Sequence, residues 1–301
     1  MTDPFAGVVG HKQALAQLRA QIATDRLAHA YLFVGEAGLG KTTTARLLAT
    51  SLLPEAPLSR HPDYWEDDRN KLIHVNEIRL IPDKPPEFHE LSLQQFLNLK
   101  PAVGARRVAV IVNIGRIRDE SQPMLLKTLE EPHPHRVIIL TTPSLNPFVV
   151  LPTVVSRCQR SAFLSVPAPE IESLLREQGV DPERAALLAG LARGRPGWAV
   201  RAAGDPDVIE RHRAAVAALE AVTGRGREPA LRLAAELDSR VAAQEAVTSW
   251  QVRLHERMGE GTDAARWATL LERSFDTLGH LEQNVSPRLA LEVFLLECAR
   301  G

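Results

Sequence analysis

The stretch from Ala30 to Leu53 constrains the fold most, because an apolar strand, a glycine loop and a helix follow one another there. Four consecutive apolar residues, 31–34, predict a buried parallel strand with cover on both faces. Residues 35–42 then match the pattern G-x-x-x-x-G-K-[ST]. Apolar residues with helical spacing follow at Ala45, Leu48, Ala49 and Leu52. This order predicts a phosphate-binding loop between a strand and a helix.

The chemistry of phosphate binding requires this arrangement. Glycines let backbone N–H groups close around phosphate oxygens, and a helix N-terminus adds partial positive charge. Lys41 would reach the β- and γ-phosphates, and the Thr42 hydroxyl can ligate Mg²⁺. Residues 8–11 precede a predicted helix at 13–23; they either fold back against a base or form a plain turn. The residues expected to bind nucleotide are Val9, Gly35, Gly38, Gly40, Lys41, Thr42 and Thr43.

Composition and charge limit the class of protein. The 301 residues suffice for two or three domains, and 36 Lys and Arg residues oppose 37 Asp and Glu residues. With so little net charge, any nucleic-acid contact must come from a local patch or from partners. The two cysteines, Cys158 and Cys298, argue for a reducing compartment and exclude a four-cysteine zinc site. Without a signal peptide or a membrane-spanning run, we expect a cytoplasmic protein with no membrane partner.

Residues 108–112 are the clearest further strand, apolar throughout and therefore central and parallel. In a hydrolysing phosphate-loop enzyme such a strand ends in Asp, which holds Mg²⁺, often followed by a Glu that activates water. Here these positions are Asn113 and Ile114, a neutral amide and a side chain that takes no proton. Either the carboxylates are lost, or another strand carries them. The strand at 137–142 ends in two threonines, whose hydroxyls either sense a γ-phosphate or cap the strand.

Other elements are less sharply defined. Within the turn-rich segment 54–101 we predict a strand at 72–75 and a helix at 91–99. Asp119 has the spacing of an N-cap for a helix that carries leucines inward and ends before Pro132.

Four further residues have side chains that are chemically reactive or able to bind a metal. His133 and His135 mark an exposed loop, and no metal site is predicted, since a third ligand is missing. Arg157 forms either a surface ion pair or an arginine finger offered to a neighbouring subunit's nucleotide. The adjacent Cys158 is expected to be a small buried hydrophobe.

The composition changes at residues 166–169, after which Ala, Leu and Arg dominate and only helices are predicted. Three helices are expected to start at an N-cap residue followed by proline, at Asp181-Pro182, Asp205-Pro206 and Ser286-Pro287. The closing helix, up to residue 296, is apolar on more than one face. Such a helix is usually buried between other helices, often those of partner subunits.

Taken together, these residues resemble one family, the AAA+ subunits of bacterial clamp loaders, and match the delta-prime type of DNA polymerase III best. The segments that carry the resemblance are His29–Phe33, the phosphate loop, Leu125–Pro132, Ser156–Cys158 and Asn284–Leu296. The Leu-Leu-Lys-Thr-Leu-Glu-Glu-Pro run and the Ser-Arg-Cys triplet are specific to clamp loaders, whereas the phosphate loop alone is not.

The resemblance implies a three-part fold: a RecA-like AAA+ α/β domain with a parallel sheet (1–165), a small helical lid (166–204) and an all-α collar for assembly (205–301). It implies gamma/tau motor subunits and a delta subunit as partners, and through the complex the sliding clamp and primer-template DNA. Arg157 would reach the adjacent motor's ATP, where such a finger is worth roughly 10³–10⁵ in rate.

Departures from the family pattern predict a stator, meaning a subunit that does not hydrolyse ATP. Besides Asn113 and Ile114, the lid arginine that senses nucleotide in motors falls at Gly197. The chain is then no enzyme on its own, while its intact loop leaves ATP binding without turnover open, with or without Mg²⁺. The zinc module of many relatives is lost, because residues 54–90 hold no cysteine. The rivals are an ATP-hydrolysing motor that recruits Asp119 as metal ligand, and a nucleotide-binding scaffold of another assembly.

Overall fold

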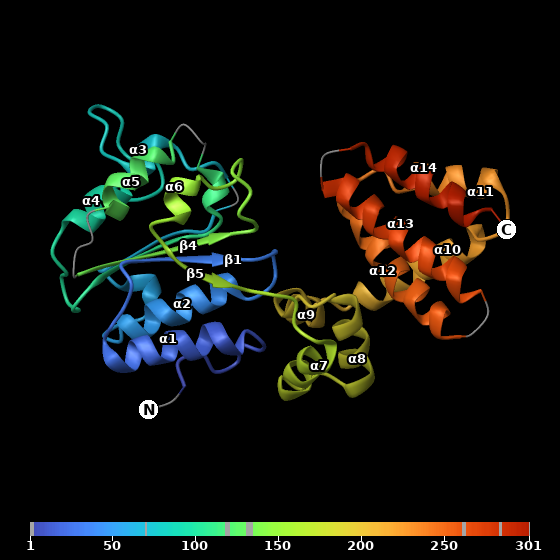
Figure 1. Cartoon of the computed structure of the whole chain (residues 1–301), viewed down its shortest axis with the longest axis horizontal. Helices are drawn as coiled ribbons and strands as arrows, with labels where there is room; N and C mark the ends of the chain where they lie inside the picture. The colour runs from blue at the N-terminus through green and yellow to red at the C-terminus, as the bar shows by residue number, and fades with distance from the viewer. Residues whose placement is uncertain are drawn as a thin grey trace. The chain divides into compact units, whose positions relative to one another are not determined.

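The computed structural model describes residues 3–69, 71–117, 121–130, 135–260, 263–282 and 285–300. The chain divides into two compact units, whose elements are labelled in Figure 1. The sheet unit comprises Met1–Ala185 and Ala192–Ala199, and the helical unit comprises Ala186–Leu191 and Val200–Gly301. The three domain ranges that the resemblance implies stay a prediction.

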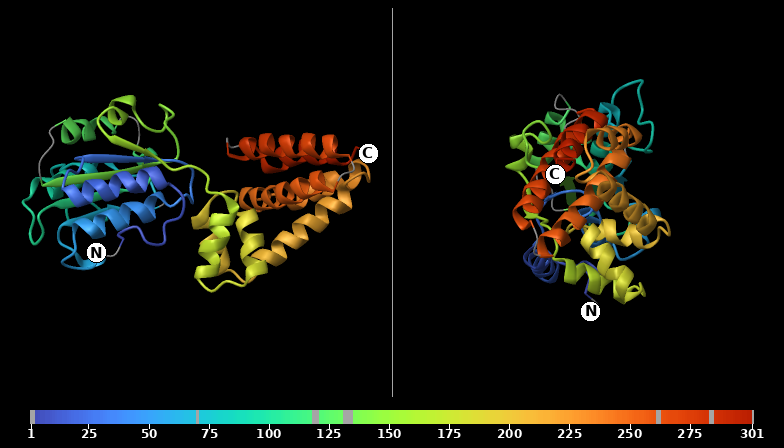
Figure 2. Two further views of the ribbon diagram at one scale, coloured as in Figure 1. Left: turned by 60° about the horizontal axis from the view of Figure 1, so that its bottom comes forward. Right: turned by 90° about the vertical axis from the view of Figure 1, so that its right-hand side faces the viewer.

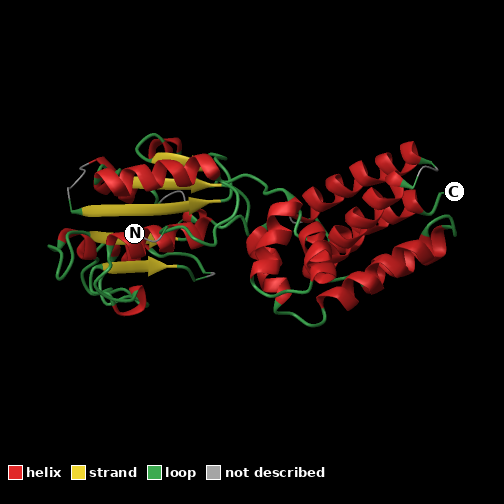
Figure 3. Cartoon of the chain, turned by 90° about the horizontal axis from the view of Figure 1, so that it is seen from below, coloured by secondary structure: helices red, strands yellow, loops and turns green. Residues whose placement is uncertain are grey.

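The described residues of the sheet unit form a five-stranded parallel sheet in the order β2-β3-β4-β1-β5, drawn as yellow arrows in Figure 3. Its strands are β1 (Ala30–Val34), β2 (Tyr64–Asp67), β3 (Arg107–Ile111), β4 (Arg136–Thr142) and β5 (Gln159–Ala162). Val34, at the end of β1, lies opposite Thr142 of β4 and Ala162 of β5. The loops that follow these three strands therefore leave from the same edge of the sheet, where α/β folds bind ligands. The predicted strands 31–34, 108–112 and 137–142 are confirmed to within one residue.

Helices cover both faces of the sheet (Figure 1). One face carries α1 (Lys12–Thr24) and α2 (Lys41–Leu52); the other carries α3 (Val75–Ile78), α4 (Leu93–Asn98), α5 (Pro123–Glu130) and α6 (Pro152–Val155). Alternate residues of β1 enter opposite cores, Tyr31 and Phe33 with α1 and α2, and Leu32 with the other group. This double cover explains why the central strands are apolar throughout. Two 3-10 turns, η1 (Leu58–Arg60) and η2 (Ile114–Arg116), lie in the connections.

Local sequence signals predicted α1, α2, α4 and α5 correctly, whereas α3 and α6 were not predicted. The four stripe residues of α2 are all buried, and so are those of α4, namely Leu93, Phe96 and Leu97. Ser92 and Gln95 form a reciprocal cap at the start of α4, in which each side chain accepts the other residue's backbone N–H. In α5 the predicted leucines 125 and 129 are buried. Its predicted N-cap, Asp119, lies outside the described residues, as does His133.

The strand predicted at residues 72–75 is wrong. Its residues make one isolated bridge, from Ile73 to Ile117, and then enter α3. The edge strand that pairs with β3 on the side away from β4 is β2, whose Asp67 is 1% exposed. Arg116 neutralises this buried carboxylate by donating from Nη1 to Oδ1 at 2.7 Å. The sequence of β2, Tyr-Trp-Glu-Asp, contains no apolar run, so no strand was predicted there. Its buried carboxylate is stabilised by an arginine that is distant in sequence.

Helices α7 (Ala168–Glu177), α8 (Pro182–Leu191) and α9 (Pro196–Ala203) follow β5. Asp181 precedes α8 as predicted, and its Oδ1 accepts the backbone N–H of Glu183 at 3.0 Å. Ser286 precedes α14 as predicted. The start predicted at Asp205 is wrong by two residues, because α10 begins at Val208.

The helical unit contains α10 (Val208–Val222), α11 (Arg227–Glu236), α12 (Arg240–Gly259), α13 (Ala264–Glu282) and α14 (Pro287–Cys298), shown in two further views in Figure 2. The indole of Trp250 stacks on Phe294 with ring centroids 5.7 Å apart, and its Nε1 donates to the carbonyl oxygen of Ala215 at 2.8 Å. These contacts join α10, α12 and α14 in one core. No helix among the described residues is long and apolar enough to cross a membrane.

Candidate phosphate loop and arginine site

The loop between β1 and α2 has the backbone geometry that its sequence predicts. Gly35, Gly38 and Gly40 adopt φ values of 152°, 84° and 90°, all in the region that favours glycine. At Gly35 a Cβ would stand 2.2 Å from the carbonyl oxygen of Phe163, because β5 pairs closely with β1. Glycine is therefore required at this position by the sheet itself, in addition to any ligand.

Lys41 opens α2 and is 8% exposed. Its Nζ donates to the carbonyl oxygens of Gly35 and Glu36, the latter at 2.6 Å. Burial lowers the pKa of this ammonium to about 8. The lysine thus lies against the loop backbone, and its ammonium is held by carbonyl oxygens of the loop. Of the two neighbouring threonines in the first turn of α2, Thr42 is half-buried and Thr43 is exposed.

The segment before α1 reaches this loop through His11. Nε2 of His11 lies 2.8 Å from the carbonyl oxygen of Leu39, which can only accept, so this nitrogen carries the proton. The imidazole also packs on Phe163, with ring centroids 4.5 Å apart, and burial lowers its pKa. Val9, the predicted base contact, is half-buried two residues away. Sequence reasoning singled out residues 8–11 but missed the role of the histidine.

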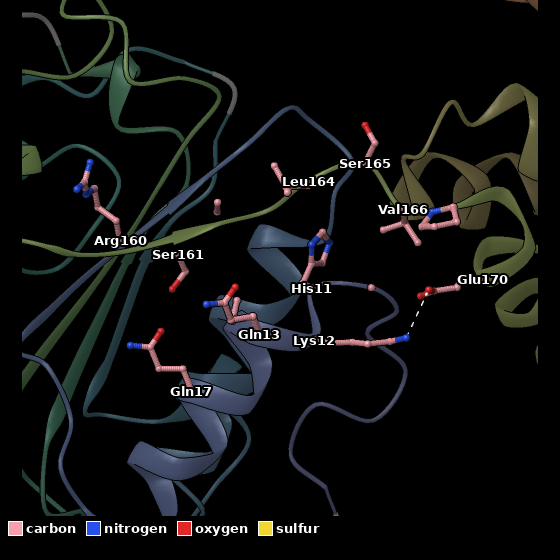
Figure 4. A pocket seen from close by; sticks show the side chains of 14 residues that line it. His11, Lys12, Gln13, Gln17, Arg160, Ser161, Leu164, Ser165, Val166 and Glu170 are labelled. Atoms are coloured by element: carbon pink, nitrogen blue, oxygen red, sulfur yellow. Dashed lines mark ion pairs between the residues drawn. The ribbon is translucent and has the colours of Figure 1, made fainter.

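A cavity of about 530 Å³ lies beside His11, between the first turns of α1, strand β5 and residues 164–167 (Figure 4). Lys12 and Glu170 form an ion pair of 3.7 Å at its rim. Neither Val9 nor the phosphate loop lines this cavity. The structure therefore brings His11 to the loop, whereas this cavity does not join Val9 to the loop residues.

The polar groups of Asn113, at the tip of β3, are hydrogen-bonded to neighbouring residues of the same chain. Asn113 has a φ of 59°, its N–H donates to Oγ1 of Thr141 at 2.8 Å, and its Oδ1 accepts the N–H of Gly115 at 3.2 Å. Ile114 is fully buried in the sheet core. Thr142 donates from Oγ1 to the carbonyl oxygen of Ser144 at 2.8 Å. Both threonine hydroxyls are thus engaged by backbone groups, as expected if they cap the end of the strand.

Metal-ligating side chains do not gather into a site within the part of the chain that the structure describes. Within the described ranges, no group of three or more His, Cys, Asp and Glu residues lies close enough to hold a metal ion. Asp119, the metal ligand that a motor would recruit, is outside those ranges.

The first turn of α9 touches the phosphate loop directly. The backbone N–H of Gly197 donates to the carbonyl oxygen of Gly38 at 2.8 Å. A Cβ on Gly197 would stand 3.0 Å from the same oxygen, tighter than a side chain normally allows. Gly197, which the resemblance predicts to stand in place of a lid arginine, thus makes a backbone contact that no sequence pattern had indicated.

Arg157 follows α6 and lies at a second site. Its Nη2 is 2.6 Å from Oε1 of Glu130, and its Nη1 donates to the carbonyl oxygen of Thr153 at 2.8 Å. Both charged side chains line a cavity of about 500 Å³ together with His29, Leu129 and Ser156. The phosphate loop of the same chain does not contribute to it. The ion-pair alternative for Arg157 is therefore realised within this chain.

Cys158 is half-buried and packs against the sheet core, and burial raises the pKa of its thiol to about 12. At neutral pH it is a neutral thiol without nucleophilic character. It packs as the expected small hydrophobe, although its burial is incomplete.

The phosphate loop at the end of a central parallel strand, with helices on both faces of the sheet, defines an α/β nucleotide-binding class of protein. Residues 10–167, more than half of the chain, match the family model described as DNA polymerase III, delta subunit. The chain belongs to this family of bacterial clamp-loader AAA+ proteins.

Curated relatives agree with this membership. DNA polymerase III subunit tau of Escherichia coli (strain K12) is 31% identical over 201 residues, which cover 63% of this chain and 31% of that protein. DNA polymerase III subunit delta' of Bacillus subtilis (strain 168) is 30% identical over 176 residues, which cover 56% of this chain and 52% of that protein. The matched residues thus span about a third to a half of these relatives.

A solved structure is similar over nearly the whole fold. The DNA polymerase III, gamma subunit-related protein from Thermotoga maritima superposes with a TM-score of 0.53 and 17% sequence identity. The match covers 94% of this chain and 100% of that one. At this identity the likeness concerns the fold alone.

Proposed function

We propose that this chain is a delta-prime-type stator of a bacterial clamp loader. It would bind nucleotide at its own loop without hydrolysing it, and offer Arg157 to the ATP site of a neighbouring motor subunit. The partners proposed with this role are gamma/tau-type motors and a delta subunit, with the sliding clamp and primed DNA reached through the complex, in the cytoplasm. On its own the chain would not be an enzyme.

One observation carries the proposal: the phosphate loop after β1 is well formed, whereas the described residues at the tip of β3, two strands away in the same sheet, include no carboxylate. Ile114 is buried in the core, and the Asn113 side chain closes its own turn. An enzyme that hydrolyses ATP needs an anionic metal ligand and a base at this tip. The loop supports binding, and the tip argues against turnover.

The proposed collar role of residues 205–301 has support in the helical unit. On α14, Leu291, Phe294 and Leu295 are buried, whereas Leu289 is 56% and Val293 is 59% exposed. These last two residues are one turn apart and form an apolar stripe on the outside of the bundle. Leu289→Asp should therefore impair assembly and spare the fold. A substitution of Val285 would test assembly less clearly, because this side chain packs against the unit's own core and its loss would also affect the fold.

The test of the stator role is ATP binding and hydrolysis by the purified chain, alone and then with motor subunits. We expect binding that Lys41→Ala abolishes, no turnover, and a reconstituted ATPase that Arg157→Ala depresses. Arg160→Ala, which removes an exposed arginine three residues away, is the matched control. An unchanged ATPase in Arg157→Ala would remove the finger role.

The second candidate is an ATP-hydrolysing motor. The intact loop and the similarity to tau subunits favour it. Turnover by the isolated chain that is lost in Lys41→Ala would establish this function in place of the stator role.

A further inference from the structure

The guanidinium of Arg157 is folded onto its own subunit. Glu130 holds Nη2 at 2.6 Å, while Nη1 donates to the carbonyl oxygen of Thr153 at 2.8 Å and to Oγ of Ser156 at 3.3 Å. Three partners of the same chain therefore satisfy two of its nitrogens. Only 33% of the arginine side chain is exposed, against 49% for Glu130. A side chain offered to a neighbour has to leave at least part of this arrangement.

Glu130 is an unexpected residue for its place in the fold. It is the last residue of α5, where the helix end carries partial negative charge and a carboxylate is unfavourable. His29 already supports this end, with Nε2 at 3.0 Å from the carbonyl oxygen of Leu129. Helix stability alone thus gives no reason for an acid at this position, whereas the contact with Arg157 does.

We propose that Glu130 is a positioning residue that holds Arg157 in a retracted state until the phosphates of a nucleotide in the neighbouring subunit take over the guanidinium. This inference rests on the finger role proposed above. Both side chains line the same cavity of about 500 Å³, which leaves the guanidinium open space into which it can move away from Glu130. A polyphosphate carries more charge than one carboxylate and can bind the fork of an arginine at two oxygens, so it wins the competition.

The strength of the ion pair between Glu130 and Arg157 follows from the solvent exposure of the two side chains. Half-exposed ion pairs are weak, so releasing this one should change the availability of Arg157 by about two- to fivefold. The restraint acts before nucleotide binds, and at saturating ATP the phosphates already hold the arginine. Its loss therefore lowers KM and leaves kcat unchanged, as expected for an interaction that opposes the ground state and the transition state equally.

The experiment compares Glu130→Gln with the unaltered chain in a complex reconstituted with motor subunits. We expect a KM for ATP that is about two- to fivefold lower at an unchanged kcat, and a difference that shrinks as salt rises. Glu130→Asp retains the charge and should stay near the unaltered KM. Glu90→Gln removes one charge from another exposed site of the sheet unit and is the control. Thermal unfolding of each variant checks the fold.

The double variant Glu130→Gln with Arg157→Ala separates the two proposals. If the restraint acts through the arginine, the double variant behaves as Arg157→Ala alone. A KM unchanged by Glu130→Gln, or a lowered kcat, overturns the restraint while an impaired Arg157→Ala keeps the finger role. An Arg157→Ala complex with full ATPase instead overturns the proposed function itself.

Discussion

The buried ammonium of Lys41 predicts an unusual pH dependence of nucleotide binding. The pKa of a lysine is ordinarily near 10.5, and burial lowers this one to about 8 in the empty loop. Only the charged form attracts phosphate, so binding is complete below this pKa and is lost as the pH rises above it. Raising the pH from about 7.5 to 9 reduces the charged fraction by roughly eightfold, and the affinity for ATP should fall by the same factor.

The assay is isothermal titration calorimetry with ATP across this pH range, in two buffers of different protonation enthalpy. Above the pKa, binding should take up about one proton, because the phosphates restore the charge on Lys41. Lys41→Arg keeps a charged side chain throughout the range and should remove the pH dependence. Affinity for the unaltered chain that stays flat up to pH 9 would refute the reasoning, because a lysine with its ordinary pKa of about 10.5 is almost fully charged there.

Three predictions concern stability, each measured by urea unfolding. Gly35→Ala places a Cβ 2.2 Å from the carbonyl oxygen of Phe163 and should cost about 3 kcal/mol; a cost below about 1 would contradict the required glycine. Gly279→Ala in α13 meets open space and should stabilise by about 1 kcal/mol, so destabilisation would show an unseen contact. Arg116→Met removes one of the two arginines that pair with buried Asp67 and leaves Arg69 in place, so it should cost about 2–3 kcal/mol at neutral pH. Burial alone would raise the pKa of Asp67, but Arg69 and Arg116 bring it below its usual value; without Arg116 the carboxyl should protonate more readily, so the cost should shrink in acid.

Elements defined by interactions between residues close in sequence were predicted, and elements defined by contacts between distant residues were not. β1, the phosphate loop and α2 were predicted because strand, glycines and helical stripe are all local signals. β2 was missed because Asp67 depends on Arg116, which is 49 residues away in sequence. No residue pattern announces such a partner, although a buried acid requires one.

The same limit applies to the candidate site. The loop glycines and Lys41 were predicted from a contiguous motif in which every residue needed for phosphate binding is close in sequence. The contacts of His11 with Leu39 and of Glu130 with Arg157 arise only when separate elements pack together. The sequence analysis identified Arg157 as a candidate but did not predict its ion pair with Glu130, since neither spacing nor composition links the two residues.

The backbone contact between Gly38 and Gly197 limits how this subunit can evolve. Any side chain at position 197, an arginine included, would begin with a Cβ 3.0 Å from the loop's carbonyl oxygen. A side chain at this position therefore requires the carbonyl oxygen of Gly38 to move by a few tenths of an ångström. The backbone of the phosphate loop and the residue at the start of α9 are thus coupled, so that a substitution at position 197 also changes the geometry available to the loop.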